Sequence, residues 1–305
     1  MTALASVFQP RGPVAAEATA LMWVLVVLGV AVFVTVVGLL LAGLVRGPRS
    51  AATSEDTIER RWLGGGGMLM PALLVTVVFG FTLDAMRDSR LEPGAVTIQM
   101  VGHQWWWEIR YDGFTTANEV VVPAGEPVVF EVTSADVIHS VWVPGLGGKI
   151  DMLPDSVNTV ILEASAPGEY WGACGEFCGL QHARMRLRVV AVTPEEYERW
   201  VEHQRLAAVS PRTEHATRGL DVFSEAGCGD CHTVRGTSAA GDSGPDLTHL
   251  ASRETLAATT LPNEAVRLGE WVRSAQSLKQ GVAMPDTELS DGDLDALVAY
   301  LGTLR

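Results

Sequence analysis

Lysine is almost absent from this chain. Only Lys149 and Lys279 occur among 305 residues, and the formal net charge is −14. Proteins that bind nucleic acid contact the phosphate backbone through clustered lysine and arginine side chains. The composition therefore argues against a nucleic-acid partner.

Cysteine is also scarce, and its four copies form two close pairs, Cys174 with Cys178 and Cys228 with Cys231. Each pair has the option of a disulfide in an oxidising compartment. Both pairs, however, lie beside a histidine at the spacing of a metal or haem site. That spacing favours ligation over disulfide formation.

Two long segments lack charged side chains altogether. Residues 18–45 and 62–83 form uncharged runs of 28 and 22 positions, and about 20 apolar residues suffice to cross a bilayer as a helix. A signal peptide is the alternative for the first run, but the run is too long and only Arg11 precedes it as a basic residue. We expect an external segment over 1–17 and a transmembrane hairpin over 18–86, with helices at about 18–45 and 63–84.

The loop between these runs sets the expected orientation. It carries Arg46, Arg49, Arg60 and Arg61, and short loops rich in arginine stay in the cytoplasm. Both chain ends, and the polar remainder from about Arg87 onward, are then expected on the periplasmic or extracytoplasmic side.

The polar remainder divides into two domains of different periodicity. Residues 87–203 contain apolar runs at 96–101, 120–122, 128–133, 159–163 and 185–190, separated by turn residues as in a β-sandwich or barrel. A helix from Pro194, with Thr193 as its N-cap, is expected to close this domain. After a polar linker over 204–216, the helical periodicity of 217–305 predicts a small all-α domain.

Copper ligands cluster in one short segment. Cys174, Cys178, His182 and Met185 lie within twelve residues, and thiolate, imidazole and thioether are the ligand set of copper in electron transfer. His139, in an upstream apolar stretch, would complete the set. A mononuclear blue-copper site needs only one cysteine, so two bridging thiolates with one histidine per metal predict a dinuclear copper centre. Met185 and the backbone carbonyl of Glu176 are the expected weak axial ligands.

Zinc bound by two cysteines and two histidines is the alternative to copper at this site. Zinc would not account for Met185, and a structural zinc would not require the membrane hairpin. The sequence therefore favours copper.

The second cysteine pair predicts a covalent haem. Cys228, Cys231 and His232 form the C-x-x-C-H pattern of c-type haem attachment, with His232 as the proximal iron ligand. Met284 is the only methionine after Met185 and is the expected sixth ligand. Ligation by methionine and histidine raises the haem potential.

The constellation of His139, Cys174, Glu176, Cys178, His182 and Met185 resembles the dinuclear copper (CuA) site of cytochrome c oxidase subunit II. The resemblance covers about residues 18–203 and extends to the aromatic stretch 102–107 and to residues 139–144. It implies a cupredoxin barrel, and it implies that the Glu176 carboxylate reaches a Mg²⁺ at the boundary with the catalytic subunit. It also implies that electrons reach copper through Trp105.

Residues 244–247 resemble the proline loop of class I cytochromes c, in which Pro245 would support the proximal histidine. The fusion as a whole resembles subunit II of a caa-type oxidase. Such a subunit accepts electrons from cytochrome c or another quinol-oxidising complex at its own haem c, and passes them through CuA to the haem a and copper of subunit I. The resemblance further implies a subunit III, a proton-translocating complex and a bacterial inner membrane.

Two other functional classes fit less well. A nitrous-oxide reductase-like enzyme also uses a dinuclear copper relay, but this chain lacks the histidine-rich cluster and the propeller which that chemistry needs. A free-standing membrane cytochrome or copper carrier is the other alternative.

The first 102 residues contain no histidine, so the chain has no intramembrane ligand for haem a. O2 chemistry must therefore belong to a partner subunit.

Overall fold

A computed structural model describes residues 8–46, 60–85 and 96–305. Arg49 in the arginine-rich loop, residues 1–7 of the expected external segment and the expected boundary at 86–87 lie outside these ranges. The chain forms two compact units, one of residues 16–90 and one of residues 1–15 together with 91–305.

The smaller unit consists of two apolar helices, as the sequence predicts. Helix α1 spans Pro13–Arg46, and a π-helical stretch η1 (Trp62–Leu69) over the glycine run continues into α3 (Met70–Ala85). Both stretches, Pro13–Arg46 and Trp62–Asp84, are long and apolar enough to cross a membrane. The hydroxyl of Thr76 donates to the Ala72 carbonyl one turn earlier, so this polar group is satisfied inside the helix.

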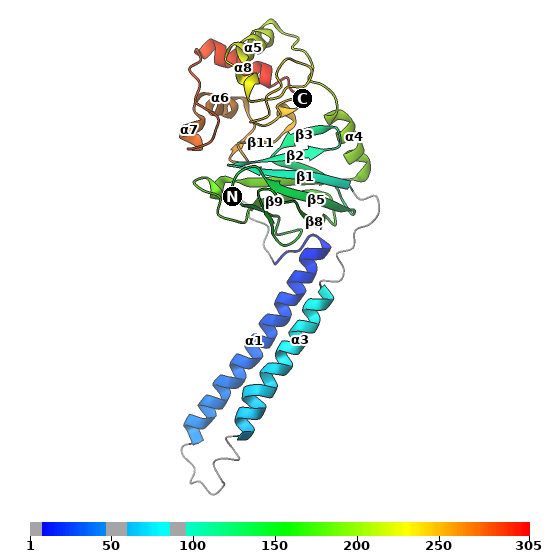
Figure 1. Cartoon of the computed structure of the whole chain (residues 1–305), viewed down its shortest axis with the longest axis vertical. Helices are drawn as coiled ribbons and strands as arrows, with labels where there is room; N and C mark the ends of the chain where they lie inside the picture. The colour runs from blue at the N-terminus through cyan, green and yellow to red at the C-terminus, as the bar shows by residue number, and fades with distance from the viewer. Residues whose placement is uncertain (1–7, 47–59, 86–95) are drawn as a thin grey trace. The chain divides into compact units, whose positions relative to one another are not determined.

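The larger unit begins with a β-sandwich of cupredoxin-like form (Figure 1). One sheet has the order β3-β2-β1-β5-β8 and the other the order β4-β10-β9-β6-β7. The first sheet consists of β1 (Val96–His103), β2 (Trp106–Tyr111), β3 (Phe114–Ala117), β5 (Pro127–Ser134) and β8 (Asn158–Glu163). The second consists of β4 (Glu119–Pro123), β6 (His139–Trp142), β7 (Ile150–Met152), β9 (Gly168–Cys174) and β10 (Arg186–Val192).

The five runs predicted as strands form strands β1, β4, β5, β8 and β10, except that Met185 lies one residue before β10 begins. Alternate side chains of a strand leave opposite faces of the sheet, so the apolar positions of these runs meet between the two sheets. Ile98, Met100, Val132 and Leu187 are almost fully buried there. The core therefore follows directly from the period-two pattern of the sequence.

Helix α4 (Pro194–Gln204) closes the sandwich, and its start confirms the predicted cap. Thr193 accepts a hydrogen bond from the Glu196 amide while the Glu196 carboxylate accepts one from the Thr193 amide. Trp200 packs edge-on against Tyr111 and against Phe114. These aromatic contacts hold the helix on the sandwich.

The C-terminal domain is helical, as predicted. Its elements are α5 (Glu214–Glu225), η3 (Cys228–Asp230), η4 (Leu250–Ser252), β11 (Thr255–Leu256), β12 (Leu261–Pro262), α6 (Ala265–Arg273), α7 (Ala275–Leu278) and α8 (Asp291–Leu301). Helix α5 packs against α8, where Phe223 and Tyr300 meet edge to face. The backbones approach most closely at Gly219, because a Cβ atom there would lie 2.0 Å from the Ala296 carbonyl oxygen.

Gly219→Ala is therefore expected to destabilise the C-terminal domain by about 1–3 kcal/mol, since overpacking a close helix contact forces the backbones apart. Gly292→Ala is the matched control, because it lies in α8 and a Cβ there meets nothing within 4 Å. We expect the control to be neutral or to stabilise by up to about 1 kcal/mol. Thermal unfolding followed at the haem absorbance band measures both, and equal midpoints for the two variants would contradict the close packing at Gly219.

Candidate metal centre and haem-attachment site

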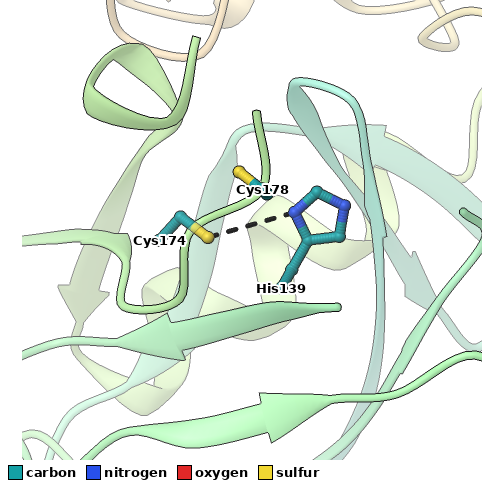
Figure 2. Close-up of side chains that lie close together, drawn as sticks. All are labelled: His139, Cys174 and Cys178. Carbon is teal, nitrogen blue, oxygen red and sulfur yellow. Dashed lines mark hydrogen bonds between the residues drawn. The ribbon is translucent and has the colours of Figure 1, made fainter. Parts of the chain in front are cut away.

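Strands β6 and β9 and the loop that follows β9 bring the predicted copper residues together. His139 is the first residue of β6, and Cys174 is the last residue of β9, which pairs with β6. Cys178 lies in the following loop. One ligand atom from each of these three buried residues falls within 4.8 Å of the others, and Figure 2 shows the two sulfurs and the imidazole facing one another.

The remaining predicted ligands surround the two sulfurs. Cys174 Sγ lies 3.9 Å from His139 Nδ1, and Cys178 Sγ lies 3.7 Å from His182 Nδ1, so each sulfur has its own imidazole. Met185 Sδ lies 3.8 Å from Cys178 Sγ, and the Glu176 carbonyl oxygen lies 3.1 Å from Cys174 Sγ. All six residues predicted from the sequence therefore converge, and their donor set and spacing fit a thiolate-bridged copper pair.

The two cysteines shift each other's pKa in opposite directions. The hydrogen bond with Cys178 lowers the pKa of Cys174 to about 3, and the same contact raises the pKa of Cys178. Burial alone would lower the pKa of His139, but its contacts with Cys174 and Asp136 raise it. Ligating cysteines must be thiolates, so metal binding at neutral pH displaces the proton held by this cluster.

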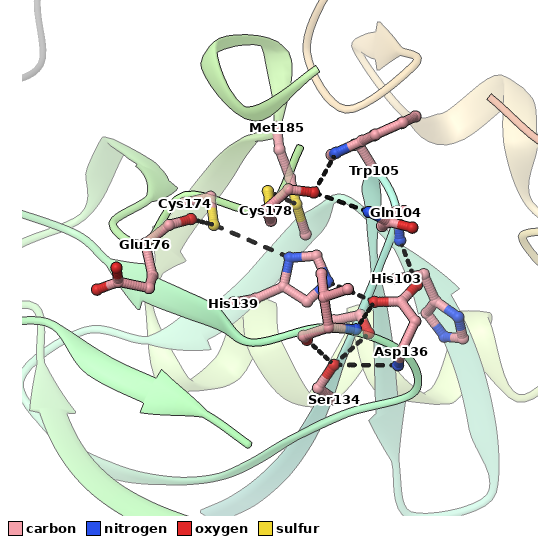
Figure 3. A network of polar contacts seen from close by, with 12 residues as sticks. His103, Gln104, Trp105, Ser134, Asp136, His139, Cys174, Glu176, Cys178 and Met185 are labelled. Carbon is pink, nitrogen blue, oxygen red and sulfur yellow. Dashed lines mark hydrogen bonds and ion pairs between the residues drawn. The ribbon is translucent and has the colours of Figure 1, made fainter. Parts of the chain in front are cut away.

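Asp136 orients His139, and the sequence reasoning missed this residue. Its carboxylate accepts from His139 Nε2 at 2.7 Å and from the Gln104 amide at 2.7 Å (Figure 3). A hydrogen bond to the far ring nitrogen fixes the tautomer that leaves Nδ1 free for a metal. The signal in the sequence was an acidic residue three positions before a candidate ligand.

The three consecutive tryptophans have different surroundings. Trp107 is fully buried in the sandwich, whereas Trp106 is half-buried and stacks on His103 with 4.3 Å between ring centroids. Trp105 is 8 % exposed, and its indole Nε1 donates to the Cys178 carbonyl oxygen at 2.9 Å. Gln104 Nε2 donates to the same oxygen at 2.8 Å. Trp105 is thus connected by one hydrogen bond to the backbone of a predicted copper ligand.

The two ends of Glu176 face in different directions. Its carbonyl oxygen points into the sulfur cluster, while its carboxylate points away from it (Figure 3). The carboxylate is half-exposed and pairs with Lys149 Nζ at 2.9 Å. The side chain therefore remains accessible at the surface of the copper domain.

The haem-attachment residues lie at the start of the C-terminal domain. Cys228 begins the single turn η3 and Cys231 directly follows it, with both cysteines free and Cys231 exposed. His232 Nδ1 bonds to the Pro245 carbonyl oxygen at 2.7 Å, which leaves Nε2 free for iron. Burial lowers the pKa of His232, so its ring is neutral, as a ligand must be.

Met284 lies on the loop before α8 and packs, partly buried, against the apolar core of the C-terminal domain, as Cys228 does. Gln276 Nε2 donates to the Met284 carbonyl oxygen at 2.7 Å and to the Val282 carbonyl oxygen at 2.7 Å. These bonds fix the backbone of the loop that carries Met284. The residues present therefore fit a haem c held by two thioethers, a histidine and a methionine.

Comparison with known proteins identifies the family. The cytochrome c oxidase subunit 2 of Alkalihalophilus pseudofirmus is 40 % identical over 256 residues, which cover 82 % of this chain and 74 % of that protein. The chain belongs to the cytochrome c oxidase subunit 2 family. The subunit 2 of Bacillus sp. (strain PS3) is 30 % identical over 251 residues, covering 78 % of this chain and 70 % of that protein.

Each outer domain also matches a family of its own. Residues 113–192 match the pattern "Cytochrome C oxidase subunit II, periplasmic domain", and residues 216–305 match "Cytochrome c". A crystal structure of the periplasmic domain of subunit II of cytochrome oxidase from Bradyrhizobium japonicum is 34 % identical over 38 % of this chain and 97 % of that chain, with a TM-score of 0.36.

Membership settles the general role. The chain is subunit 2 of a haem-copper oxidase with a cytochrome c domain fused in the same chain, and the two families imply copper and haem c as its cofactors. A subunit 2 associates with other subunits of the oxidase. The two apolar helices agree with membrane anchoring.

Proposed function

We propose that this subunit accepts electrons at its own haem c and passes them through the dinuclear copper centre to the O2-reducing subunit. The observation that carries the proposal is that all six predicted copper residues converge, and that they lie in the same compact unit as the C-terminal domain. Copper bound by two thiolates supplies one-electron transfer, and haem c supplies the same at the C-x-x-C-H site. O2 reduction takes place at haem a and copper in subunit I.

Residues of this chain hold the copper ligands in a fixed geometry, which favours rapid electron transfer. Asp136 fixes His139, and the loop from Cys174 to Met185 lies against the sandwich core with Cys178 and Met185 buried. A site whose ligands are held by packing and hydrogen bonds changes little in geometry when an electron arrives. Trp105, bonded to the Cys178 carbonyl, is the residue through which we propose that electrons reach this site.

The charge of the C-terminal domain suits a basic donor. After Arg212 the chain has seven lysine and arginine residues against 14 aspartate and glutamate residues. Complementary charge accelerates encounter between proteins. We propose a cytochrome c, or else a quinol-oxidising complex, as the donor, with subunits I and III as partners in a proton-translocating complex.

We also propose that the helices span a bacterial inner membrane, with the N-terminus, copper domain and haem domain on the periplasmic side. Arg46, Arg60 and Arg61 flank the connection between the helices, and the positive-inside rule supports a cytoplasmic connection. Covalent haem c is assembled on the periplasmic side, which agrees with this orientation.

Glu176 is proposed to serve two metals. Its carbonyl oxygen faces the copper residues, and its half-exposed carboxylate is the proposed ligand of a Mg²⁺ at the boundary with subunit I. Mg²⁺ takes oxygen ligands and binds through one or two carboxylates. Lys149 pairs with this carboxylate in the chain alone, so cation binding would displace the lysine.

Glu176→Gln is expected to weaken the binding of the interfacial cation by at least about tenfold, because the neutral amide lacks the charge that Mg²⁺ prefers. The copper spectrum should be nearly unchanged, since a backbone carbonyl survives the substitution. Electron paramagnetic resonance of Mn²⁺ substituted for Mg²⁺ in the assembled complex measures the affinity. Glu163→Gln, on an edge strand of the sandwich, is a control of equal charge change. An unchanged Mn²⁺ signal in Glu176→Gln would leave Glu176 as a residue of the copper loop alone.

Rapid reduction of the assembled oxidase tests the proposed order of electron flow. With a reduced cytochrome c as donor, absorbance of haem c should change first, that of the copper pair second and that of haem a last. Metal analysis with a denaturing haem stain should give two coppers beyond those of subunit I and one covalent haem in this chain. Reduction of copper before haem c would contradict the proposed order.

A further inference from the structure

A short segment of the C-terminal domain, Leu278–Gly281, lies directly on the copper loop. The Arg184 guanidinium donates to the Leu278 carbonyl oxygen at 2.6 Å, and Gln181 Nε2 donates to the Gln280 carbonyl oxygen at 2.7 Å. Gly281, at φ +87°, presents bare backbone to the Trp105 indole, because a Cβ atom there would lie 3.5 Å from the ring. The segment therefore covers the side of Trp105 that faces away from Cys178.

Lys279 is the centre of this contact. Its side chain is only 1 % exposed, and its ammonium donates to three backbone carbonyl oxygens. Those of Trp105 at 2.8 Å and Arg184 at 3.0 Å belong to the copper domain, whereas that of Ala257 at 2.9 Å belongs to the C-terminal domain. An ammonium has three N–H donors, so these three acceptors satisfy it completely.

Burying a lysine is costly unless its charge is compensated. Burial lowers the pKa of Lys279 to about 7, with the nearby Arg184 as the second cause. Lys279, one of only two lysines in the chain, is thus buried between two domains at a cost in free energy. Three convergent carbonyl dipoles offset this cost only while the domains stay together.

The same segment connects to the predicted haem ligand. Gln276 accepts from the Gly281 amide at 3.0 Å and donates to the Val282 and Met284 carbonyl oxygens at 2.7 Å each. The Lys279 amide in turn bonds to the Ala275 carbonyl at 2.8 Å. A displacement of Lys279 is therefore transmitted to the loop that carries Met284.

We propose that Lys279 is a positioning residue that holds the fused cytochrome domain on the copper loop in the geometry for electron transfer. The inference rests on the proposed route from haem c to copper. The step concerned moves one electron from ferrous haem iron to the oxidised copper pair, leaves ferric iron, and makes or breaks no bond. With Trp105 covered by the segment 278–281, the donor to this tryptophan is the chain's own cytochrome domain rather than a mobile protein.

A second contact between the domains is independent of Lys279. The Glu119 carboxylate, paired with Arg188 at 3.0 Å, accepts from the Thr255 amide at 2.8 Å and from the Thr255 hydroxyl at 2.6 Å. Loss of Lys279 should therefore loosen the contact at the copper loop while the contact at Glu119 persists. A loosened contact at the copper loop together with an unchanged contact at Glu119 would therefore identify the effect of Lys279.

Hydrogen exchange of the assembled oxidase tests the positioning role. In Lys279→Met, exchange of peptides covering 278–284 and 178–185 should accelerate about tenfold or more, because hydrogen bonds to a charged donor are lost. Peptides covering 119–123 and 254–256 should keep their wild-type rates. Arg267→Met, which removes one exposed cation from the same domain, is the matched control and should change neither set.

Photoreduction of haem c then measures the transfer itself. Electron arrival at copper should slow several-fold in Lys279→Met, because the rate of electron transfer falls as the distance between donor and acceptor groups grows. The absorbance spectra of haem and copper should be unchanged. Lys279→Gln retains two donors, so it should keep part of the contact and give intermediate exchange and transfer rates.

Unchanged exchange in both Lys279 variants would overturn the proposal, as would looser exchange with an unchanged transfer rate. Absence of haem-to-copper transfer in the wild-type oxidase would instead overturn the proposed function and with it the transfer role of Lys279. The exchange rates alone would then show whether Lys279 holds the domains together, so the two failures are distinguishable.

Discussion

Cys178→Ser is expected to abolish the proposed dinuclear copper centre. A serine hydroxyl stays protonated at neutral pH and cannot replace a bridging thiolate, so Cys174 would be the only thiolate left at the site, enough for one metal. Cys178 also contacts both His182 and Met185, at 3.7 Å and 3.8 Å from its sulfur. Loss of the Cys178 sulfur therefore also removes the contacts that hold His182 and Met185 at the site.

The copper content of this chain should fall from two atoms to at most one, and the paramagnetic signature of an electron shared by two coppers should vanish. Oxygen consumption with a cytochrome c donor should fall by at least about 100-fold, since even the loss of a supporting hydrogen bond costs about 10–100-fold at metal sites. Covalent haem should remain at one per chain, because Cys228 and Cys231 are unchanged. Retention of two coppers with their shared-electron signal would exclude a bridging role for Cys178.

Met284→Leu is expected to lower the haem potential by roughly 0.1 V or more, because axial ligands set haem potentials over a range of about 0.8 V. A methionine opposite a histidine favours the ferrous state, and leucine offers no ligand atom. Reduction of haem c by its donor becomes less favourable, so the copper centre should be reduced more slowly. The copper spectrum should be unaffected, since Met284 lies in the other domain.

A redox titration of haem c and stopped-flow reduction of copper measure the two effects. Met100→Leu is the matched control, because Met100 is 1 % exposed in the sandwich core and the same substitution there should cost less than about 1.5 kcal/mol. It should change neither the potential nor the reduction rate. A lowered haem potential in Met284→Leu with an unchanged rate of copper reduction would show that electrons bypass the haem.

The fold was predictable from the sequence because its signals are local. Alternating runs such as 96–101 and 128–133 form strands β1 and β5, and the uncharged runs form apolar helices. Thr193 and Pro194 define the start of α4 through a cap that involves only neighbouring residues. Which strands pair was not readable in this way, and β1 lies parallel to β5 through contacts between residues about thirty positions apart.

The sequence by itself determined the chemistry of the candidate site. Residue types and spacing within the segment 174–185, together with His139 and the C-x-x-C-H pattern, were enough to predict a copper pair and a haem. Only the tertiary structure decided how the two are joined. The bond from Trp105 to Cys178 spans 73 positions, and the bond from Lys279 to Trp105 spans 174. Such contacts depend on how separately folded domains pack together, and no local pattern of polarity or spacing encodes that packing.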